Sequence, residues 1–243
     1  MQEDGSWQVL NNMRRVSKLF IQIMALCSAW SCSETREVTP QDLGVNYYPL
    51  QTGSYTVYHV EGVEYINPED SVEFSYQLKE SVVDSFLNLE SGISYKMLRE
   101  IRDNEDQEWQ TDSVWTVRKD NIRVIRTESN IPVINLVFPI RENTIWDANG
   151  FNDRKPDSYE MVDAGKPFVG EFVSFDETVT VIQEDIPDTF TAFLFSKEIY
   201  AQDVGLVYKE NLKLIFKQGD DYGNEIVDSG IRYFQSIITH GEE

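Results

Sequence analysis

The sequence predicts an all-β fold, a single and mainly antiparallel curled sheet that is barrel-like or a sandwich, with few short helices. Three observations lead to this class. Apolar and polar side chains alternate along several short runs, as they do in half-buried strands. Turn-forming residues separate these runs. No long segment repeats its apolar residues with the helical period of about 3.6 residues.

The clearest predicted strand is the run 72–78, in which Val72, Phe74, Tyr76 and Leu78 alternate with polar side chains. Shorter alternating runs predict further strands at 94–97, 121–124, 178–182, 212–217 and 231–237. Turns are expected at 61–62, 67–68, 91–92, 119–121 and 219–223. The segment 81–89 fits either a short helix or a continued strand, and residues 147–170 are expected to form a long ordered loop.

The N-terminal segment is organised like a bacterial secretion signal. Residues 13–18 contain three basic side chains, residues 19–30 carry no charge, and small residues surround Cys32. A basic start, a short apolar run and a small-residue cleavage site together make a secretory signal. A cysteine at the cleavage point resembles the lipobox of bacterial lipoproteins, and this resemblance implies that the sulfur of Cys32 is lipidated.

Two alternatives for this segment are weaker. A transmembrane helix needs about 20 apolar residues, whereas this run is shorter and contains Gln22. Cys27 is the other candidate for lipidation, but residues 24–26 before it do not end in the small side chain that cleavage requires. We expect translation to begin at the second methionine, Met13.

The chain is therefore divided into an N-terminal extension with the signal peptide (1–32), a flexible polar tether (33–45) and a single β domain (46–243). Both cysteines lie in the signal region, so the β domain must be stabilised by its core rather than by disulfides. In didermic bacteria an aspartate after the lipidated cysteine tends to retain a lipoprotein in the inner membrane. Ser33 stands there, so we expect a lipid anchor in the outer membrane, facing the periplasm or the cell surface.

The part after the signal is strongly acidic. Residues 33–243 contain 18 basic and 40 acidic residues, because three of the 21 basic and two of the 42 acidic residues lie before Ser33, and their net charge is −22. Such a charge excludes nucleic acid as a partner and disfavours direct electrostatic attraction to anionic lipid. It is typical of a solvated acidic surface, and it also suits divalent cations or basic partners.

Several short motifs occur in an order that resembles a family of uncharacterised Bacteroidetes lipoproteins. They are Tyr47-Tyr48-Pro49-Leu50 followed by Gly53, Tyr55 and Tyr58, then Lys79-Glu80, Leu136-Val137-Phe138-Pro139, Trp146-Asp147 with Asn149 and Asn152, Tyr200-Ala201, and Val204-Gly205-Leu206-Val207-Tyr208-Lys209-Glu210. The resemblance covers nearly the whole mature chain, although Ala148-Asn149 stands where the family has Gly-Asn. It implies a mostly-β lipoprotein of the outer envelope, and it implies no activity.

Few residues suggest catalysis. Zinc-protease, nucleophile-elbow, phosphate-loop and dinucleotide motifs are absent, and the two histidines, His59 and His240, have no ligand-spaced neighbours. Paired carboxylates could hydrolyse glycosides, but 40 acidic residues do not single out a pair. We therefore assign no catalytic residue, no metal ligand and no cofactor. Calcium is the one ion that the oxygen-rich segments 147–153 and 220–228 would suit, although 147–153 departs from the EF-hand pattern.

The candidate binding residues are Trp146, Asp147, Asn149 and Asn152, at the start of the expected loop, together with Trp109. Large aromatic side chains next to amide and carboxylate oxygens are common in recognition loops. The alternative is a tight turn in which Asp and Asn side chains bond their own backbone, while Trp146 and Phe151 pin the loop to the core. Trp115, within an apolar run, is expected in the core.

The sequence thus predicts a membrane-anchored envelope lipoprotein that acts as a non-catalytic binding or assembly module. Its expected partners are the membrane, through the N-terminal lipid, and an envelope protein or glycan. A carboxylate-dependent glycan or lipid hydrolase and a carrier of an apolar ligand are the alternatives. Two facing carboxylates about 5–9 Å apart would favour the hydrolase, an enclosed apolar cavity would favour the carrier, and a flat aromatic patch would favour the binding module.

Overall fold

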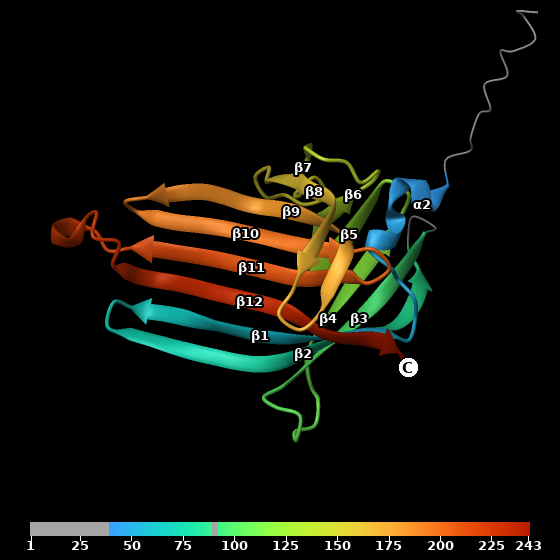
Figure 1. The fold of residues 1–243 in the computed structure, drawn as a ribbon, viewed down its shortest axis with the longest axis horizontal. Helices are drawn as coiled ribbons and strands as arrows, with labels where there is room; N and C mark the ends of the chain where they lie inside the picture. Colours follow the sequence, from blue (N-terminus) through green and yellow to red (C-terminus); the bar gives the residue numbers. More distant parts are fainter. Residues whose placement is uncertain (1–38, 89–91) are drawn as a thin grey trace, which may run out of the picture. The chain divides into compact units, whose positions relative to one another are not determined.

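Twelve strands form one sheet in the computed structural model of the protein, which describes residues 39–88 and 92–243 (Figure 1). The order across the sheet is β6-β5-β4-β3-β2-β1-β12-β11-β10-β9-β8-β7, and all hydrogen-bonded neighbours are antiparallel. The predicted all-β class, with a single curled sheet, is confirmed. The predicted signal peptide, Cys32 and residues 33–38 of the tether lie outside the described residues.

The strands are β1 (Ser54–Asn67), β2 (Asp70–Leu87), β3 (Ile93–Arg102), β4 (Gln110–Lys119), β5 (Arg123–Glu128), β6 (Ile131–Val137), β7 (Thr144–Asp147), β8 (Ser158–Val169), β9 (Ser174–Thr189), β10 (Ala192–Ala201), β11 (Gly205–Phe216) and β12 (Val227–Glu242). The helical elements are α2 (Pro40–Leu43) and two 3-10 turns, η2 (Val45–Tyr47) and η3 (Gly219–Asp221). Within the described ranges, no helix is long and apolar enough to cross a membrane.

The alternating runs of the sequence coincide with strands. The run 72–78 lies in β2, those at 94–97, 178–182 and 231–237 lie in β3, β9 and β12, and those at 121–124 and 212–217 overlap β5 and β11. Residues 81–87 continue β2 instead of forming a helix, because Val82 is buried and pairs with Met97 across β2 and β3. Alternation therefore identifies strands here because one face of each strand is covered.

Two expectations are wrong. Gly62 lies inside β1 rather than in a turn, because neighbouring backbone approaches it closely: a Cβ on Gly62 would lie 2.0 Å from the carbonyl oxygen of Arg232. The expected loop 147–170 ends at residue 157, and β8 follows. That strand forms because Met161 is buried opposite Val181 of β9.

The sheet curls until its two edges meet, which gives a nearly closed barrel (Figure 1). The edge strands β6 and β7 do not pair as strands, and side-chain and loop contacts join them instead. The Ile134 N–H donates to the Ala148 carbonyl oxygen at 2.9 Å, and the Trp146 indole N–H donates to the Ile134 carbonyl oxygen at 2.9 Å. The Asn152 amide donates to the Pro132 carbonyl oxygen at 2.8 Å. We call this junction the seam.

The residues before β1 cover one end of the barrel, which we call the closed end. Thr39 and Asp42 bond each other reciprocally at the start of α2, and Gly44 ends α2 with φ +75°, a left-handed conformation that favours glycine. Leu43 and Val45 then pack against the core. The last residues of the predicted tether are therefore part of the folded unit.

The core consists of two clusters. The cluster at the closed end includes Tyr48, Met97, Val117, Leu136, Met161, Val181 and Tyr200. The second cluster includes Tyr58, Val60, Leu78, Ile199, Val207 and Ile237, and aromatic residues of the β8–β9 hairpin pack against it. Strands β1, β2 and β9 to β12 run on from the closed end as a long arm, to the left in Figure 1.

Candidate functional site

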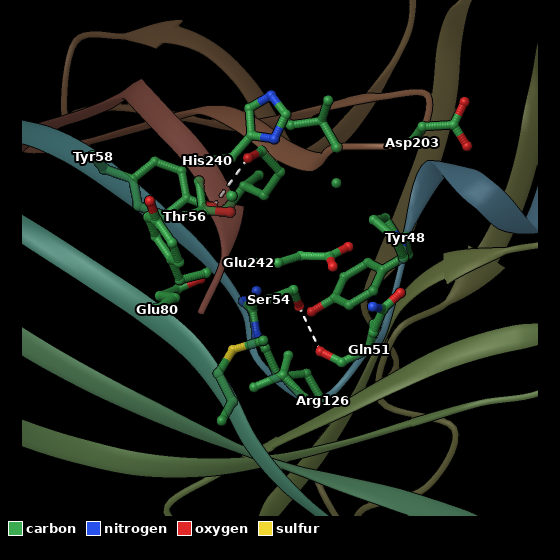
Figure 2. A pocket seen from close by; sticks show the side chains of 18 residues that line it. Tyr48, Gln51, Ser54, Thr56, Tyr58, Glu80, Arg126, Asp203, His240 and Glu242 are labelled. Atoms are coloured by element: carbon green, nitrogen blue, oxygen red, sulfur yellow. Dashed lines mark hydrogen bonds between the residues drawn. The ribbon is translucent and has the colours of Figure 1, made fainter.

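A cavity of about 330 Å³ lies at the closed end of the barrel. Its lining comes from residues 48–51 after η2, the start of β1, the β10–β11 turn and the end of β12, together with residues of β2, β3 and β5. The sheet register brings the two chain ends together there, because Ser54 at the start of β1 pairs with Glu242 at the end of β12. Figure 2 shows the side chains that line the cavity.

The outer part of the lining, the rim, is polar and consists of Gln51, Ser54, Asp203, His240 and Glu242. The Ser54 hydroxyl donates to the Gln51 carbonyl oxygen at 2.7 Å. The Asp203 carboxylate accepts a bond of 3.0 Å from the side-chain amide of Asn46. In Figure 2 the Glu242 carboxylate points toward the ring of Tyr48, in the middle of the cavity. The rim therefore presents hydroxyl, amide and carboxylate groups.

Three tyrosines, Tyr48, Tyr55 and Tyr58, form an aromatic wall. The Tyr58 hydroxyl donates to the Leu206 carbonyl oxygen at 3.0 Å. Burial raises the pKa of Tyr58 well above its ordinary value, and burial also raises the pKa of Tyr48. The Tyr58 hydroxyl is thus already engaged inside the protein.

Glu80 and Arg126 form the floor of the cavity, and partners inside the barrel neutralise both. Oε1 of Glu80 accepts a bond of 3.0 Å from Nε of Arg99. Nε of Arg126 lies 2.6 Å from Oε1 of Glu128, and its Nη2 lies 3.3 Å from Oε1 of Glu198. The floor is thus charged but internally balanced.

Glu198 is the centre of this buried network. Nζ of Lys209 lies 3.0 Å from the same Oε1 that Arg126 contacts, and the Tyr200 hydroxyl donates to the other carboxylate oxygen. Burial alone would raise the pKa of Glu198, but Lys209, Arg126 and Tyr200 outweigh burial and hold the pKa well below its ordinary value. Glu198 is therefore an ionised counter-ion, which fixes Arg126 at the floor.

Trp115 of β4 fixes the same network from the other side. The guanidinium of Arg99 lies 3.9 Å from the centre of an indole ring of Trp115, and that of Arg126 lies 4.9 Å away. Trp115 packs against the closed-end cluster, as expected, but it does so between two cations. The sequence did not reveal this network, because its members come from β2, β3, β4, β5, β10 and β11.

Hydrogen-bonding groups and aromatic faces are what the cavity offers to a ligand. Its floor charges already have partners, whereas the rim side chains Gln51, Asp203, His240 and Glu242 are exposed. In the part of the chain that the structure describes, no group of three or more His, Cys, Asp or Glu side chains could hold a metal ion. A ligand rich in hydroxyl or amino groups matches this lining best.

No protein-family model and no curated protein sequence matches the chain. Among solved structures, the chain is similar to one from Bacteroides fragilis NCTC 9343, provisionally described as an exported protein with a YmcC-like fold. The TM-score is 0.44 with 10% identity, over 80% of this chain and 98% of that chain. It is also similar to a protein from Parabacteroides distasonis ATCC 8503, provisionally described as a lipoprotein, with a TM-score of 0.36, 10% identity and the same two coverages.

Four of the predicted binding residues come together at the seam and not at the cavity. Trp146 and Asn152 bond carbonyl oxygens of β6. Oδ1 of Asp147 accepts from the Asn149 N–H at 3.0 Å, and Oδ1 of Asn149 accepts from the Asn152 amide at 2.9 Å. These are the bonds of the tight-turn alternative. A binding role for this segment stays a prediction.

Trp109 lies apart from the other four predicted residues, directly before β4. The guanidinium of Arg102 lies 4.3 Å from the centre of its ring. In the acidic segment 220–228, Asp221 forms an ion pair of 2.7 Å with Lys217. Calcium binding there stays a prediction.

Some of the motifs that resemble the lipoprotein family contribute to the cavity, whereas those at 136–139 and 146–152 do not. Their residues in the lining are Tyr48, Pro49, Tyr55, Tyr58, Glu80, Val204, Gly205 and Leu206. These positions are far apart in the chain and meet only through strand pairing, so no local pattern of the sequence brings them together. His240 and Glu242 carry no sequence signal, because neither belongs to a motif.

Proposed function

We propose that the protein is an envelope lipoprotein, held on the outer membrane by a lipid on Cys32, whose β domain binds a ligand in the closed-end cavity without converting it. The balanced floor is the observation that supports binding. Glu80 and Arg126 are each engaged by partners inside the barrel, at 3.0 Å from Arg99 and at 3.3 Å from Glu198. Groups held in this way shape and orient a site.

A polyhydroxylated ligand, such as a segment of an envelope glycan, suits the lining best. The partly exposed Tyr55 supplies an aromatic ring against which a sugar can pack, and Ser54 and Glu242 supply hydrogen-bonding groups. The rim carboxylates Asp203 and Glu242 disfavour an anionic ligand. A volume of about 330 Å³ is at the lower end of the range for small-molecule sites, about 300–1,000 Å³.

The two alternatives from the sequence receive less support. A carrier of an apolar ligand needs an apolar cavity, whereas charged and hydroxyl-bearing side chains line this one from rim to floor. A hydrolase needs two carboxylates that face one bond, and one oxygen of the floor carboxylate, Glu80, already accepts from Arg99.

Isothermal titration calorimetry of the mature protein with neutral oligosaccharides tests the proposal. Glu242→Gln and Ser54→Ala each remove a rim group, so each should weaken binding by about tenfold, or about 1.4 kcal/mol, while Tm stays unchanged. Glu243→Gln is the matched control, since Glu243 is the next carboxylate, is exposed, and pairs with Lys79 outside the lining.

Two results would contradict the proposal. One is the absence of measurable binding to any neutral oligosaccharide. The other is an equal loss of affinity in Glu242→Gln and Glu243→Gln. Appearance of shortened oligosaccharides during the titration would instead support the hydrolase.

A further inference from the structure

Four exposed apolar side chains gather at the rim of the closed end, on the side of β2 to β5. Leu87 is 77% exposed, and it pairs across β2 and β3 with Ile93, which is 53% exposed. Ile122, in the β4–β5 turn, is 57% exposed. Phe151 lines the same hollow as Ile93, with its ring centre 5.2 Å from the guanidinium of Arg123. We call Leu87, Ile93, Ile122 and Phe151 the rim cluster.

The chain enters the folded unit beside this cluster. Lys119 lines the same hollow as Ile93, and its ammonium donates to the carbonyl oxygens of Val45 and Tyr48 at 3.1 and 2.6 Å. The segment from Thr39 to Tyr48 is therefore tied to the β4–β5 end of the sheet, and Figure 1 shows α2 at the same end.

The length of chain before Thr39 restricts where the lipid can lie. Six residues separate Cys32 from Thr39, so even a fully extended chain reaches roughly 25 Å. By contrast, β12 has 16 residues and spans about 53 Å. A lipid on Cys32 therefore keeps the closed end near the bilayer, while the tips of the long arm can point away from it.

The distribution of charge also favours an orientation with the closed end toward the bilayer. The tips of the long arm carry the acidic residues Glu64, Glu69, Asp70, Glu73, Glu184, Asp185, Asp220, Asp221, Glu225 and Asp228 against Lys213, Lys217 and Arg232. Around the rim cluster, Arg118, Lys119 and Arg123 accompany Asp120. One carboxylate oxygen of Asp120 already accepts the N–H groups of residues 122 and 123. The strongly acidic end is thus the one that anionic headgroups would repel.

We propose that the rim cluster docks the β domain directly on the lipid bilayer, with its apolar side chains among the headgroups and the acidic arm pointing away. Exposed apolar clusters of this kind mark membrane or protein contacts, and the short tether selects the membrane. This inference rests on the lipid anchor of the proposed function. It places the cavity, which lies at the same end on the side of β1 and β12, close to the membrane surface.

Fluorescence quenching in vesicles tests the docking. The mature lipoprotein with lipid on Cys32 has no other thiol, so a single probe can be attached at Ile93→Cys, at Ile122→Cys, or at the far tip with Ile66→Cys. The vesicles contain phosphatidylethanolamine, phosphatidylglycerol and a lipid with a nitroxide near its headgroup. We expect quenching at positions 93 and 122 to be several-fold stronger than at position 66. Leu87→Asp should reduce quenching at position 122, and Val72→Asp, at the far tip, should not.

Three results would overturn the proposal. Equal quenching at positions 66, 93 and 122 would show that the domain has no preferred face toward the bilayer. A probe at position 93 or 122 that is unquenched in these vesicles but shielded from solvent in native membranes would assign the rim cluster to a protein partner. Protein that fails to incorporate into vesicles at all would show that the anchor is missing, which removes the proposed function's membrane attachment together with the docking.

Discussion

Nη2 of Arg126 lies 3.3 Å from Oε1 of Glu198, and the two side chains are 6% and 0% exposed. Arg126 belongs to β5 and Glu198 to β10, which are not neighbours in the sheet, so this contact crosses the barrel interior. Because Glu198 also binds Lys209, one carboxylate holds two cations beneath the cavity. Buried ion pairs of this kind are costly to break from one side.

Glu198→Gln should destabilise the fold by about 3–5 kcal/mol, because it leaves Arg126 and Lys209 without their shared counter-ion inside the barrel. Urea denaturation followed by circular dichroism measures the change. Glu128→Gln removes the more exposed partner of Arg126 and should cost about 1 kcal/mol or less. Equal losses of unfolding free energy in the two variants would show that the buried pair of Arg126 and Glu198 contributes no more to stability than the more exposed pair of Arg126 and Glu128.

Glu198 also makes stability depend on pH on the acid side. Its pKa in the folded protein lies well below its ordinary value of 4.5, so the stability it contributes is fully present above that value and is lost as the pH falls toward the folded pKa. The difference in unfolding free energy between the wild type and Glu198→Gln should be constant near neutral pH and shrink below about pH 4. Urea titrations across this range measure it. A difference that stays unchanged at low pH would mean that the pKa of Glu198 is the same in the folded and the unfolded protein.

The strands could be predicted from the sequence, whereas the site could not, and both results have physical reasons. The run from Val72 to Leu78 predicts β2, because burial of one face of a strand makes its apolar and polar residues alternate. The pair of Arg126 and Glu198 leaves no such local trace, since 72 residues separate its partners. The cavity depends on the register that sets Ser54 opposite Glu242, and register is a property of pairs of strands.

The wrong prediction of a turn at Gly62 also arises because contacts between strands leave no local trace in the sequence. A glycine next to a carboxylate suggests a turn, but here it accommodates the backbone of β12 and the ring of Phe74. Gly62→Ala should therefore cost about 1–3 kcal/mol, because its Cβ would lie 2.0 Å from the Arg232 carbonyl oxygen. Gly150→Ala, whose Cβ would meet nothing closer than 3.4 Å, is the control and should be nearly neutral. Thermal denaturation of the two variants compares them directly.

The proposed lipid anchor on Cys32 can be tested by substitution. Cys32→Ala should abolish incorporation of labelled palmitate and release the protein from the membrane fraction, because alanine has no thiol that can carry the acyl chains of the anchor. Cys27→Ala serves as the matched control and should leave labelling intact. Labelling that survives Cys32→Ala but is lost in Cys27→Ala would move the anchor to the other cysteine.

Substitutions at the seam can distinguish a structural role of Trp146 from a binding role. Trp146 donates its indole N–H to the Ile134 carbonyl oxygen at 2.9 Å and packs against the closed-end cluster, so Trp146→Ala should cost about 3–5 kcal/mol. Asn152→Ala removes a bond of 2.8 Å to Pro132 and should cost about 1 kcal/mol. Trp109→Ala is the matched control, since its contact with Arg102 is worth about 0.5–1 kcal/mol. Differential scanning calorimetry ranks the three. If Trp146→Ala instead leaves Tm unchanged but abolishes capture of an envelope partner, the segment is a recognition loop and the seam does not depend on its indole.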